Sequence, residues 1–279
     1  MITAAERLQF LARRIYHRAR RDVAAVMHPI GARADIEFWE ELRGRHTGRA
    51  GFVIGCGPSL CASDLDQLRG ELTLASNRIN LAFDQTDWRP DYFAISDWVL
   101  FPKIKRHLAD QYELVLGGPD MPRRLSGTRM VRWHWLGQPH GQPTADGEYC
   151  FSDNASQGIW SGGTITFDLM QIAAHMGCDR IVLIGCDHQY EGEDDIDPRD
   201  LMETPPNVQN HFDDQYRMPG ERVRPACLNL MTRAFRHAKA WSDATGVQIV
   251  NATRGGALDI FPRVTLEEVL AEQPTSSMS

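Results

Sequence analysis

The sequence predicts an α/β fold with a mostly parallel sheet, and two observations lead to it. First, short apolar segments alternate with segments of helical periodicity, which is the pattern of parallel strands joined by crossover helices. Second, 279 residues with 42% hydrophobic and 24% charged content have the size and composition of one large globular domain with extensions. We therefore expect a Rossmann-like sheet with flanking helices, preceded by an N-terminal amphipathic helix.

Charge and hydropathy exclude several classes of protein. A chain with a net charge of −7 is a poor match for nucleic-acid binding, which needs a basic surface. No apolar run reaches the roughly 18 to 20 residues of a membrane-spanning helix, and the start lacks a secretory signal, so we expect a cytoplasmic protein. The six cysteines form no C-x-x-C pair, which favours buried, reduced thiols over a zinc site.

Residues 1–48 are expected to form a helical extension. From Glu6 to Met27 apolar residues recur at helical spacing and arginines crowd the other positions, which predicts a basic amphipathic helix that Pro29 and Gly31 end. Such a helix can lie on an anionic membrane surface, or it can pack its apolar stripe on the domain, and both interpretations stay open. A second short helix is expected over residues 36–42.

Residues 49–272 are expected to form the Rossmann-like domain, and residues 273–279 a disordered tail. The predicted strands are Gly51–Ile54, Glu71–Ala75, Tyr92–Ser96, Glu113–Leu116, Met130–Trp133, Arg180–Ile184 and Val247–Asn251. The predicted helices are Ser63–Arg69, Phe101–Ala109, Thr164–Met176, Ala226–Ala244 and Leu266–Leu270. Residues 136–163 and 191–224 have no clear periodicity, and long irregular loops of this kind often carry function.

A glycine-rich turn directly after the first strand is the first candidate site. Gly55, Gly57, Pro58 and Ser59 follow an apolar segment and precede a helix, where glycines allow positive φ and close ligand approach. The helix start offers free N–H groups to an anion, so the turn is a candidate phosphate cradle. Leu60 stands where a dinucleotide fingerprint has its third glycine, and a purely structural turn is the alternative.

Polar residues at the ends of other predicted strands fit the same cleft. Asn77, Asp97 and Asp187 each follow a strand, at the edge of an open parallel sheet where ligands bind. Gly163 and Thr164 open a helix whose first amides can meet an anion. Asp187 can bind a ribose, coordinate a metal or orient another group. A cap or turn is the alternative for each of these residues.

The irregular segments hold the remaining candidates. His211 lies in a polar loop beside carboxylates, which suits general acid–base work because the pKa of histidine is near neutral and easily tuned. A surface histidine without a catalytic role is the alternative. His134, His140 and His188 are weaker candidates. Asp195 and Asp197 form a D-x-D pattern that can bind a divalent cation or be a solvated acidic loop. Near the C-terminus, Arg254 or Arg263 can meet phosphate in a turn that closes the cleft, and a purely structural turn is the alternative.

Taken together, these blocks resemble the MptE-like family. That family is named for the archaeal 6-hydroxymethylpterin diphosphokinase, and it is similar to Maf flagellin glycosyltransferases and to bacterial sialyltransferases that use CMP-sialic acid. The resemblance covers about residues 50–270, and the order of the blocks is its most specific feature. It is carried by residues 53–60, Ser76-Asn77, Ser96-Asp97, the Gly-Gly-Thr helix with residues 181–187, Asn210-His211-Phe212 and residues 251–256.

The resemblance implies a nucleotide-binding transferase in surface glycan biosynthesis. It implies nucleotide contacts for Gly55, Gly57, Ser59 and Asn77, and a catalytic role for His211. The expected activity is sialyltransferase-like transfer of a sugar from a CMP-type donor to a glycan or small-molecule acceptor, without metal. One alternative is transfer of pyrophosphate from ATP to a hydroxymethyl pterin, with Mg²⁺ on Asp97 and Asp187. The other is a non-catalytic nucleotide-binding module.

Overall fold

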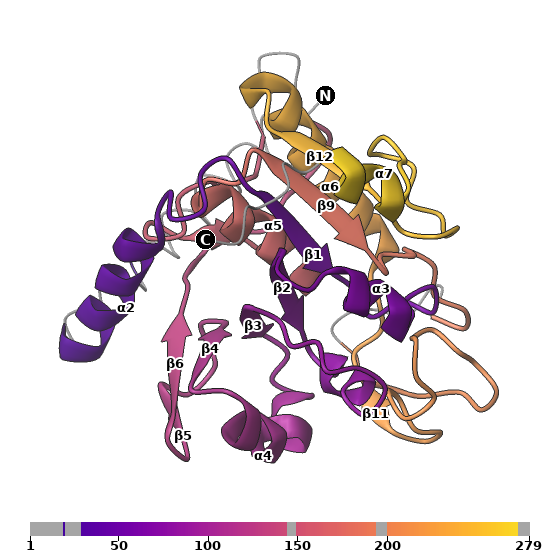
Figure 1. The fold of residues 1–279 in the computed structure, drawn as a ribbon. Coiled ribbons are helices and arrows are strands. Elements are labelled where there is room, and N and C mark those ends of the chain that lie inside the picture. The colour runs from indigo at the N-terminus through magenta and orange to yellow at the C-terminus, as the bar shows by residue number, and fades with distance from the viewer. Residues whose placement is uncertain (1–18, 20–28, 144–148, 194–199, 273–279) are drawn as a thin grey trace.

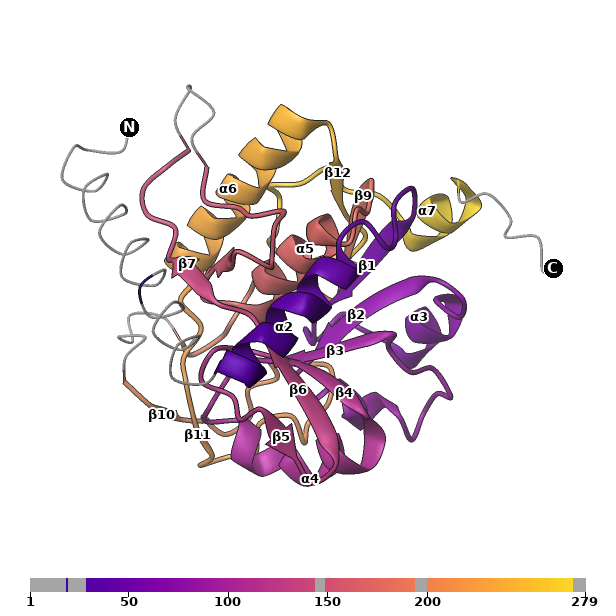
Figure 2. The same ribbon diagram turned by 90° about the vertical axis from the view of Figure 1, so that its left-hand side faces the viewer.

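One central sheet between two layers of helices forms the fold (Figures 1 and 2). The computed structural model describes residue 19 and residues 29–143, 149–193 and 200–272. In this part of the chain, the main sheet has eight strands in the order β12-β9-β1-β2-β3-β4-β6-β5. Neighbouring strands pair in parallel except β5, which is antiparallel to β6. The predicted α/β class is therefore confirmed.

The strands are short, as parallel strands of a buried sheet usually are. Those of the main sheet are β1 (Ala50–Ile54), β2 (Leu72–Ser76), β3 (Tyr92–Ile95), β4 (Leu114–Gly117), β5 (Arg124–Leu125), β6 (Thr128–Arg132), β9 (Arg180–Ile184) and β12 (Gln248–Asn251). Two small ladders stand apart from it, namely β7 (Trp135–Gly137) with β8 (Ile159–Trp160) and β10 (Met202–Glu203) with β11 (Arg222–Val223).

The helices divide between the two faces of the sheet. On one face lie α2 (Pro29–Leu42), α5 (Ile165–His175) and α6 (Leu228–Thr245). On the other lie α3 (Ala62–Gln67), α4 (Phe101–Gln111), α7 (Leu266–Glu272) and the 3-10 turn η1 (Ile79–Ala82). Both faces need cover because side chains alternate along a strand. In β1, Val53 packs on the side of α2, α5 and α6, while Phe52 and Ile54 pack on the side of α3, α4 and α7, and all three are fully buried.

The chain crosses the sheet in a way that creates a crevice. From β1 it builds outward through β2, β3, β4 and β6, and then α5 returns it to the other side of β1, where β9 and β12 follow. The strand order therefore reverses between β1 and β9. In open α/β sheets, ligands bind outside the carboxyl ends of the strands at such a reversal.

Every predicted strand and helix of the sheet domain is present, with ends shifted by a few residues. The short strands β5, β7, β8, β10 and β11 and the turn η1 were not predicted, because elements of two to four residues leave no periodicity to detect. Pro29 and Gly31, expected to end a helix, instead lie within α2.

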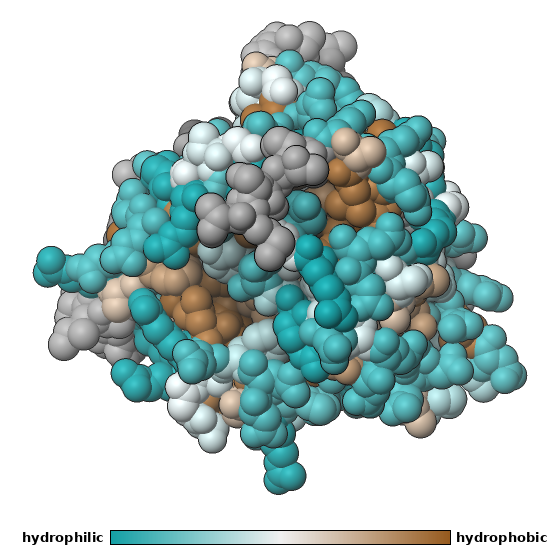
Figure 3. Space-filling view, viewed as in Figure 1, coloured by the Kyte–Doolittle hydropathy of each residue, from teal (hydrophilic) through white to brown (hydrophobic). Residues whose placement is uncertain are grey.

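Several expectations concern residues outside those that the structure describes. These are the basic helix from Glu6 to Met27, the Asp195–Asp197 pattern and the tail over 273–279. None of the described helices has the length and apolar character that a membrane crossing requires. The cysteines are free thiols, and Cys150, Cys178 and Cys186 are buried as expected, whereas Cys61 is exposed. On the face seen in Figure 3, hydrophilic residues predominate and apolar residues show mainly in two hollows.

Candidate functional site

A cavity of about 690 Å³ opens at the carboxyl ends of the parallel strands. The predicted residues in its wall are Gly55, Gly57, Asn77, Asp97, Gly163, Thr164, Asp187 and His211. They come from the ends of β1, β2, β3 and β9, from the start of α5 and from the long loop before α6. Pro58 and Ser59 are not in this wall. The cavity lies where the strand order reverses, so the site predicted from separate motifs forms one continuous surface.

The glycines of the turn after β1 are needed for space. Neither Gly55 nor Gly57 has a positive φ, so the expected conformational role is wrong. A Cβ at Gly55 would meet the carbonyl oxygen of Gly185 at 2.3 Å, and one at Gly57 would meet Asp187 Oδ2 at 1.9 Å. Glycine is required here because the turns after β1 and β9 approach closely.

Most amides of this turn bond within the protein. The amide of Gly55 donates to Ile184 O at 2.8 Å, and the amide of Gly57 donates to Gly185 O, also at 2.8 Å. The amide of Ser59 lies 3.4 Å from Asp187 Oδ2. The expectation that this turn cradles a phosphate through several backbone donors therefore needs correction. Its geometry fits the turn to the end of β9 and leaves few donors for a ligand.

The N-terminus of α5 also lines the cavity. Thr164 caps the helix as predicted, because its side chain accepts a hydrogen bond from the amide of Thr166 at 3.3 Å. Gly163 has a φ of +76°, which places it in the left-handed region that favours glycine. Ile165 and Thr166 also line the cavity. This end of the helix carries partial positive charge, but the amides of Thr166 and Phe167 both bond to Thr164, which leaves few of the first amides for an anion.

Asp187 is held at the centre of the site. Its side chain is buried, and Ser59 Oγ donates a hydrogen bond to Oδ2 at 2.8 Å. The amide of Ala257 bonds the Asp187 carbonyl at 2.7 Å, which fixes the backbone. Burial raises the pKa of Asp187 above its usual value, while the bonds from Ser59 act in the opposite direction.

His211 is more confined than its sequence environment indicates. It is 9% exposed, and its ring stacks on Tyr216 with centroids 3.7 Å apart and planes 8° apart. The amide of Phe212 donates to Cys56 O at 3.1 Å, which joins this loop to the turn after β1. Burial, together with the smaller effects of the Arg217 and Arg78 charges, lowers the pKa of His211 to about 2. The expectation of a near-neutral pKa is therefore wrong, because the loop packs as part of the core.

Two non-glycine residues in the cavity wall have strained backbones. Asn77 has a φ of 57° and His188 a φ of 55°, in the left-handed region. His188 Nε2 lies 2.8 Å from Thr232 Oγ1, while Nδ1 and the Oδ1 of Asn77 are buried without a partner. Such strain and unpaired polar atoms cost free energy and gather at functional sites. His188 was a weak candidate from sequence, since backbone strain leaves no sequence signal outside glycine.

Asp97 serves as a local cap. Its Oδ1 accepts hydrogen bonds from the amides of Val99 at 2.7 Å and Leu100 at 3.3 Å, just before α4. Asp97 and Asp187 follow strands β3 and β9, which are three strand spacings, or roughly 14 Å, apart. Within the described part of the chain, no group of three His, Cys, Asp or Glu residues fits a metal ion.

Asp168 is a site residue that sequence reasoning missed. It lies in the first turn of α5, lines the cavity and is 3% exposed, and its Oδ1 has no hydrogen-bond partner. Burial raises the pKa of Asp168 well above its usual value, against a smaller opposite effect of the Ser96 hydroxyl. Burial therefore favours the protonated form of this side chain, whose position in a helix looks ordinary in the sequence.

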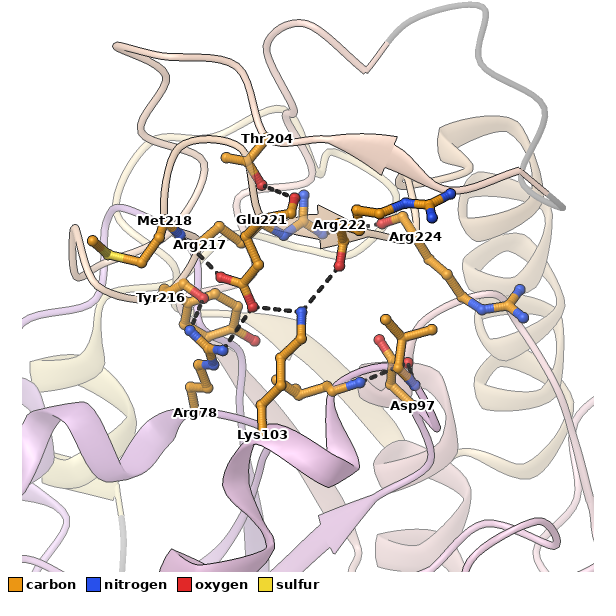
Figure 4. A network of polar contacts seen from close by, with 12 residues as sticks. Arg78, Asp97, Lys103, Thr204, Tyr216, Arg217, Met218, Glu221, Arg222 and Arg224 are labelled. Carbon is orange, nitrogen blue, oxygen red and sulfur yellow. Dashed lines mark hydrogen bonds and ion pairs between the residues drawn. The ribbon is translucent and has the colours of Figure 1, made fainter.

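A cluster around Glu221 fastens the long loop over the cavity (Figure 4). Glu221 Oε1 accepts from Arg78 at 2.8 Å and from Lys103 at 2.6 Å. Lys103 also donates to Arg222 O at 3.0 Å, and Arg78 to Tyr216 O at 2.6 Å. Burial alone would raise the pKa of Glu221, but its hydrogen bonds and these charges together lower it. The partners are far apart in sequence, so no motif could reveal this cluster.

A second buried carboxylate holds the base of the same loop. Glu193 accepts hydrogen bonds from Arg217, from the amide of Ala226 at 2.6 Å and from Asn210 Nδ2 at 3.1 Å. Its side chain is buried. The loop that carries His211 is therefore fixed at both ends by ionic contacts.

The C-terminal arginines do not reach this cavity. Arg254 forms an ion pair with Asp64, and Arg263 donates to the carbonyls of Leu258 and Thr253 at 3.1 and 3.0 Å. Both line a separate hollow of about 460 Å³ beside α7. The expectation that this segment closes the main cleft is therefore wrong, because these side chains are used to brace the end of β12.

Comparison with known proteins gives a limited result. No family model matches the chain, and no curated protein matches it. A Maf glycosyltransferase structure from Magnetospirillum magneticum AMB-1 is similar with a TM-score of 0.48 and 12% identity, over 84% of this chain and 38% of that chain. A short-chain dehydrogenase/reductase from Serratia marcescens BCRC 10948 gives a TM-score of 0.26 and 10% identity, over 81% of this chain and 89% of that chain. The MptE-like assignment stays a prediction.

Proposed function

We propose that the chain is a nucleotide-dependent glycosyltransferase that moves a sugar from a CMP-type donor to a glycan or small-molecule acceptor. The observation that carries the proposal is the cavity at the strand reversal, whose wall holds the N-terminus of α5, a buried aspartate and a buried histidine. The choice of chemistry comes from the sequence resemblance described above.

The donor phosphate is proposed to bind at the start of α5. The start of α5 lines the cavity and carries the partial positive charge of a helix N-terminus, whereas most amides of the turn after β1 bond within the protein. Negative charge builds up on the phosphate as the sugar leaves, so donors fixed in advance stabilise the transition state more than the ground state. In this proposal, Gly55 and Gly57 shape the floor and Asn77 contacts the nucleoside.

His211 is proposed to accept the proton of the acceptor hydroxyl. With a pKa near 2 in the empty cavity, its ring is neutral at any working pH and can take a proton. Burial makes the protonated ring costly, and an anionic donor beside it would reduce that cost and raise the pKa. Stacking on Tyr216 would hold the ring in one orientation. Asp187 would use the carboxylate oxygen that Ser59 does not occupy to bind a donor hydroxyl.

A ligand screen tests the proposal and its alternatives. We would measure thermal stability with CMP, CDP, UDP, GDP and ATP, each with Mg²⁺ and with a chelator, since a ligand that binds the folded state raises its apparent stability. Preferential stabilisation by cytidine nucleotides in chelator, followed by transfer from a CMP-sugar, is the expected result. Stabilisation only by ATP with Mg²⁺ would favour the diphosphokinase alternative. Binding without turnover on any CMP-sugar would favour a non-catalytic module.

A further inference from the structure

An exposed tryptophan stands at the rim of the cavity. Trp98 is 53% exposed and lines the wall, and Met218 is the other large hydrophobic residue with comparable exposure in the described chain. A solvent-facing indole loses the stabilisation that burial would bring, roughly 25 cal/mol for each Å². Met218 does not line the cavity, so it provides an internal comparison for this position.

The indole is held in place from two sides. Asp97 accepts hydrogen bonds from the amides of Val99 and Leu100 and so fixes the turn that carries Trp98. From the opposite wall, the Arg224 guanidinium lies 5.2 Å from the centroid of the Trp98 ring. A cation over an indole is attractive, which favours this orientation of the ring. Figure 4 shows Arg224 on the loop side and Asp97 on the turn side of the same opening.

The position of Trp98 separates it from the proposed chemistry. It follows β3, two strand spacings from β1, so it lies roughly 10 Å along the sheet edge from the turn that contacts the His211 loop. A nucleotide donor is a small molecule that can sit wholly inside the cavity. An acceptor that is part of a larger glycan has to extend out through the mouth, past this ring.

We propose that Trp98, held by Arg224, is a stacking platform for a pyranose ring of the acceptor glycan. The apolar C–H face of a pyranose matches the flat indole, and polar residues of the cavity wall such as Gln138 can bond its hydroxyl groups. The inference rests on the proposed glycosyltransferase function, and it adds the class and the position of the acceptor.

The experiment compares Trp98→Ala and Trp98→Phe with the matched control Met218→Ala. Binding of lactose, cellobiose and N-acetyllactosamine is followed by saturation-transfer NMR in the presence of CMP, and CMP affinity is measured separately by calorimetry. Trp98→Ala should weaken saccharide binding about tenfold, which corresponds to roughly 1.4 kcal/mol. Trp98→Phe should lie in between, and Met218→Ala should match the wild type. All variants should keep their thermal stability, because both side chains are exposed.

The outcomes separate this inference from the proposed function. Saccharide binding that depends on Trp98, in a protein that transfers no sugar from any CMP donor, would refute the glycosyltransferase activity and keep the platform. Transfer that proceeds with unchanged acceptor KM in Trp98→Ala would refute the platform alone. Loss of CMP affinity in Trp98→Ala with intact saccharide binding would also overturn it, because the ring would then hold the nucleobase. A wild-type protein that binds none of the saccharides counts against the platform.

Discussion

Ser59 Oγ donates a hydrogen bond to Asp187 Oδ2 at 2.8 Å and so joins the turn after β1 to the end of β9. These residues are 128 positions apart in the sequence. The bond crosses the point where the strand order reverses, and beneath it the amide of Gly57 bonds the carbonyl of Gly185. The two turns are therefore linked, and a substitution in either turn should shift the position of the other.

Replacing Gly57 with valine should displace Asp187 and abolish nucleotide binding. The added Cβ would lie 1.9 Å from Asp187 Oδ2 and 2.8 Å from Gly185 O. We expect a loss of about 1–3 kcal/mol in the free energy of unfolding, the usual cost of overpacking, and no thermal shift with CMP. In a Gly57→Ala/Asp187→Ala double variant, the destabilisation should be smaller than the sum of the single changes. Additive effects would show that Asp187 is not the residue displaced.

His211→Ala should lower turnover by roughly 10²- to 10⁴-fold, the range for a lost acid–base group, with little change in CMP affinity. Because burial lowers the pKa of His211 to about 2, kcat/KM should show no inflection near pH 6.5 from this residue. Steady-state kinetics from pH 5 to 8 would check both expectations. A variant with full turnover would remove His211 from the chemistry, and lost CMP affinity alone would make it a nucleotide contact.

Asp168→Asn should stabilise the protein at neutral pH. The wild-type carboxyl keeps its proton in the folded state, while the unfolded chain releases it above about pH 3.8. Between the unfolded and folded pKa values, the free energy of unfolding falls as pH rises, by about 1.4 kcal/mol per pH unit. The variant lacks this loss, so the free energies of unfolding of the two proteins should be equal below pH 3.8 and should differ increasingly above it. Denaturant unfolding at several pH values measures this difference. The expectation would be contradicted if the free energy of unfolding depended on pH in the same way in both proteins.

Glu221→Ala should release the loop that carries His211. Arg78 and Lys103 would lose their shared carboxylate partner, whose side chain is 14% exposed. Hydrogen bonds to charged groups contribute about 1.5–3 kcal/mol each at most, so a total loss of about 1–3 kcal/mol is expected. Hydrogen exchange should speed up at residues 204–223 and stay unchanged in β1. As a control, Glu37→Ala breaks the exposed pair with Arg33 and should have almost no effect.

The fold was readable from the sequence because its elements have strong periodicity. A run such as Arg180–Ile184, apolar and followed by Gly and Asp, predicts both a buried parallel strand and a polar residue at its end. Thr164 was recognised as a helix cap for a similarly local reason. In each case, the physical cause lies within a few residues of the feature it produces.

The details of the site depend on distant partners and could not be predicted in the same way. The pKa of His211 is set by Tyr216 packing and by the charges of Arg78 and Arg217. The glycine turn looked like a phosphate loop because its sequence does not show that Gly185 and Asp187 fill the space beside it. The Glu221 cluster likewise joins segments more than a hundred residues apart.

The two outer strands of the main sheet affect how the molecule behaves in a crowded solution. At one edge, β5 has only two residues and folds back on β6 through a tight turn. At the other, Asn251 of β12 exchanges backbone hydrogen bonds with Pro262 and Val264, so a following segment covers part of that border. Unpaired strand borders are templates on which other chains assemble into aggregates. Because one edge strand is short and the other is partly covered, strands of neighbouring molecules have few free backbone groups with which to pair.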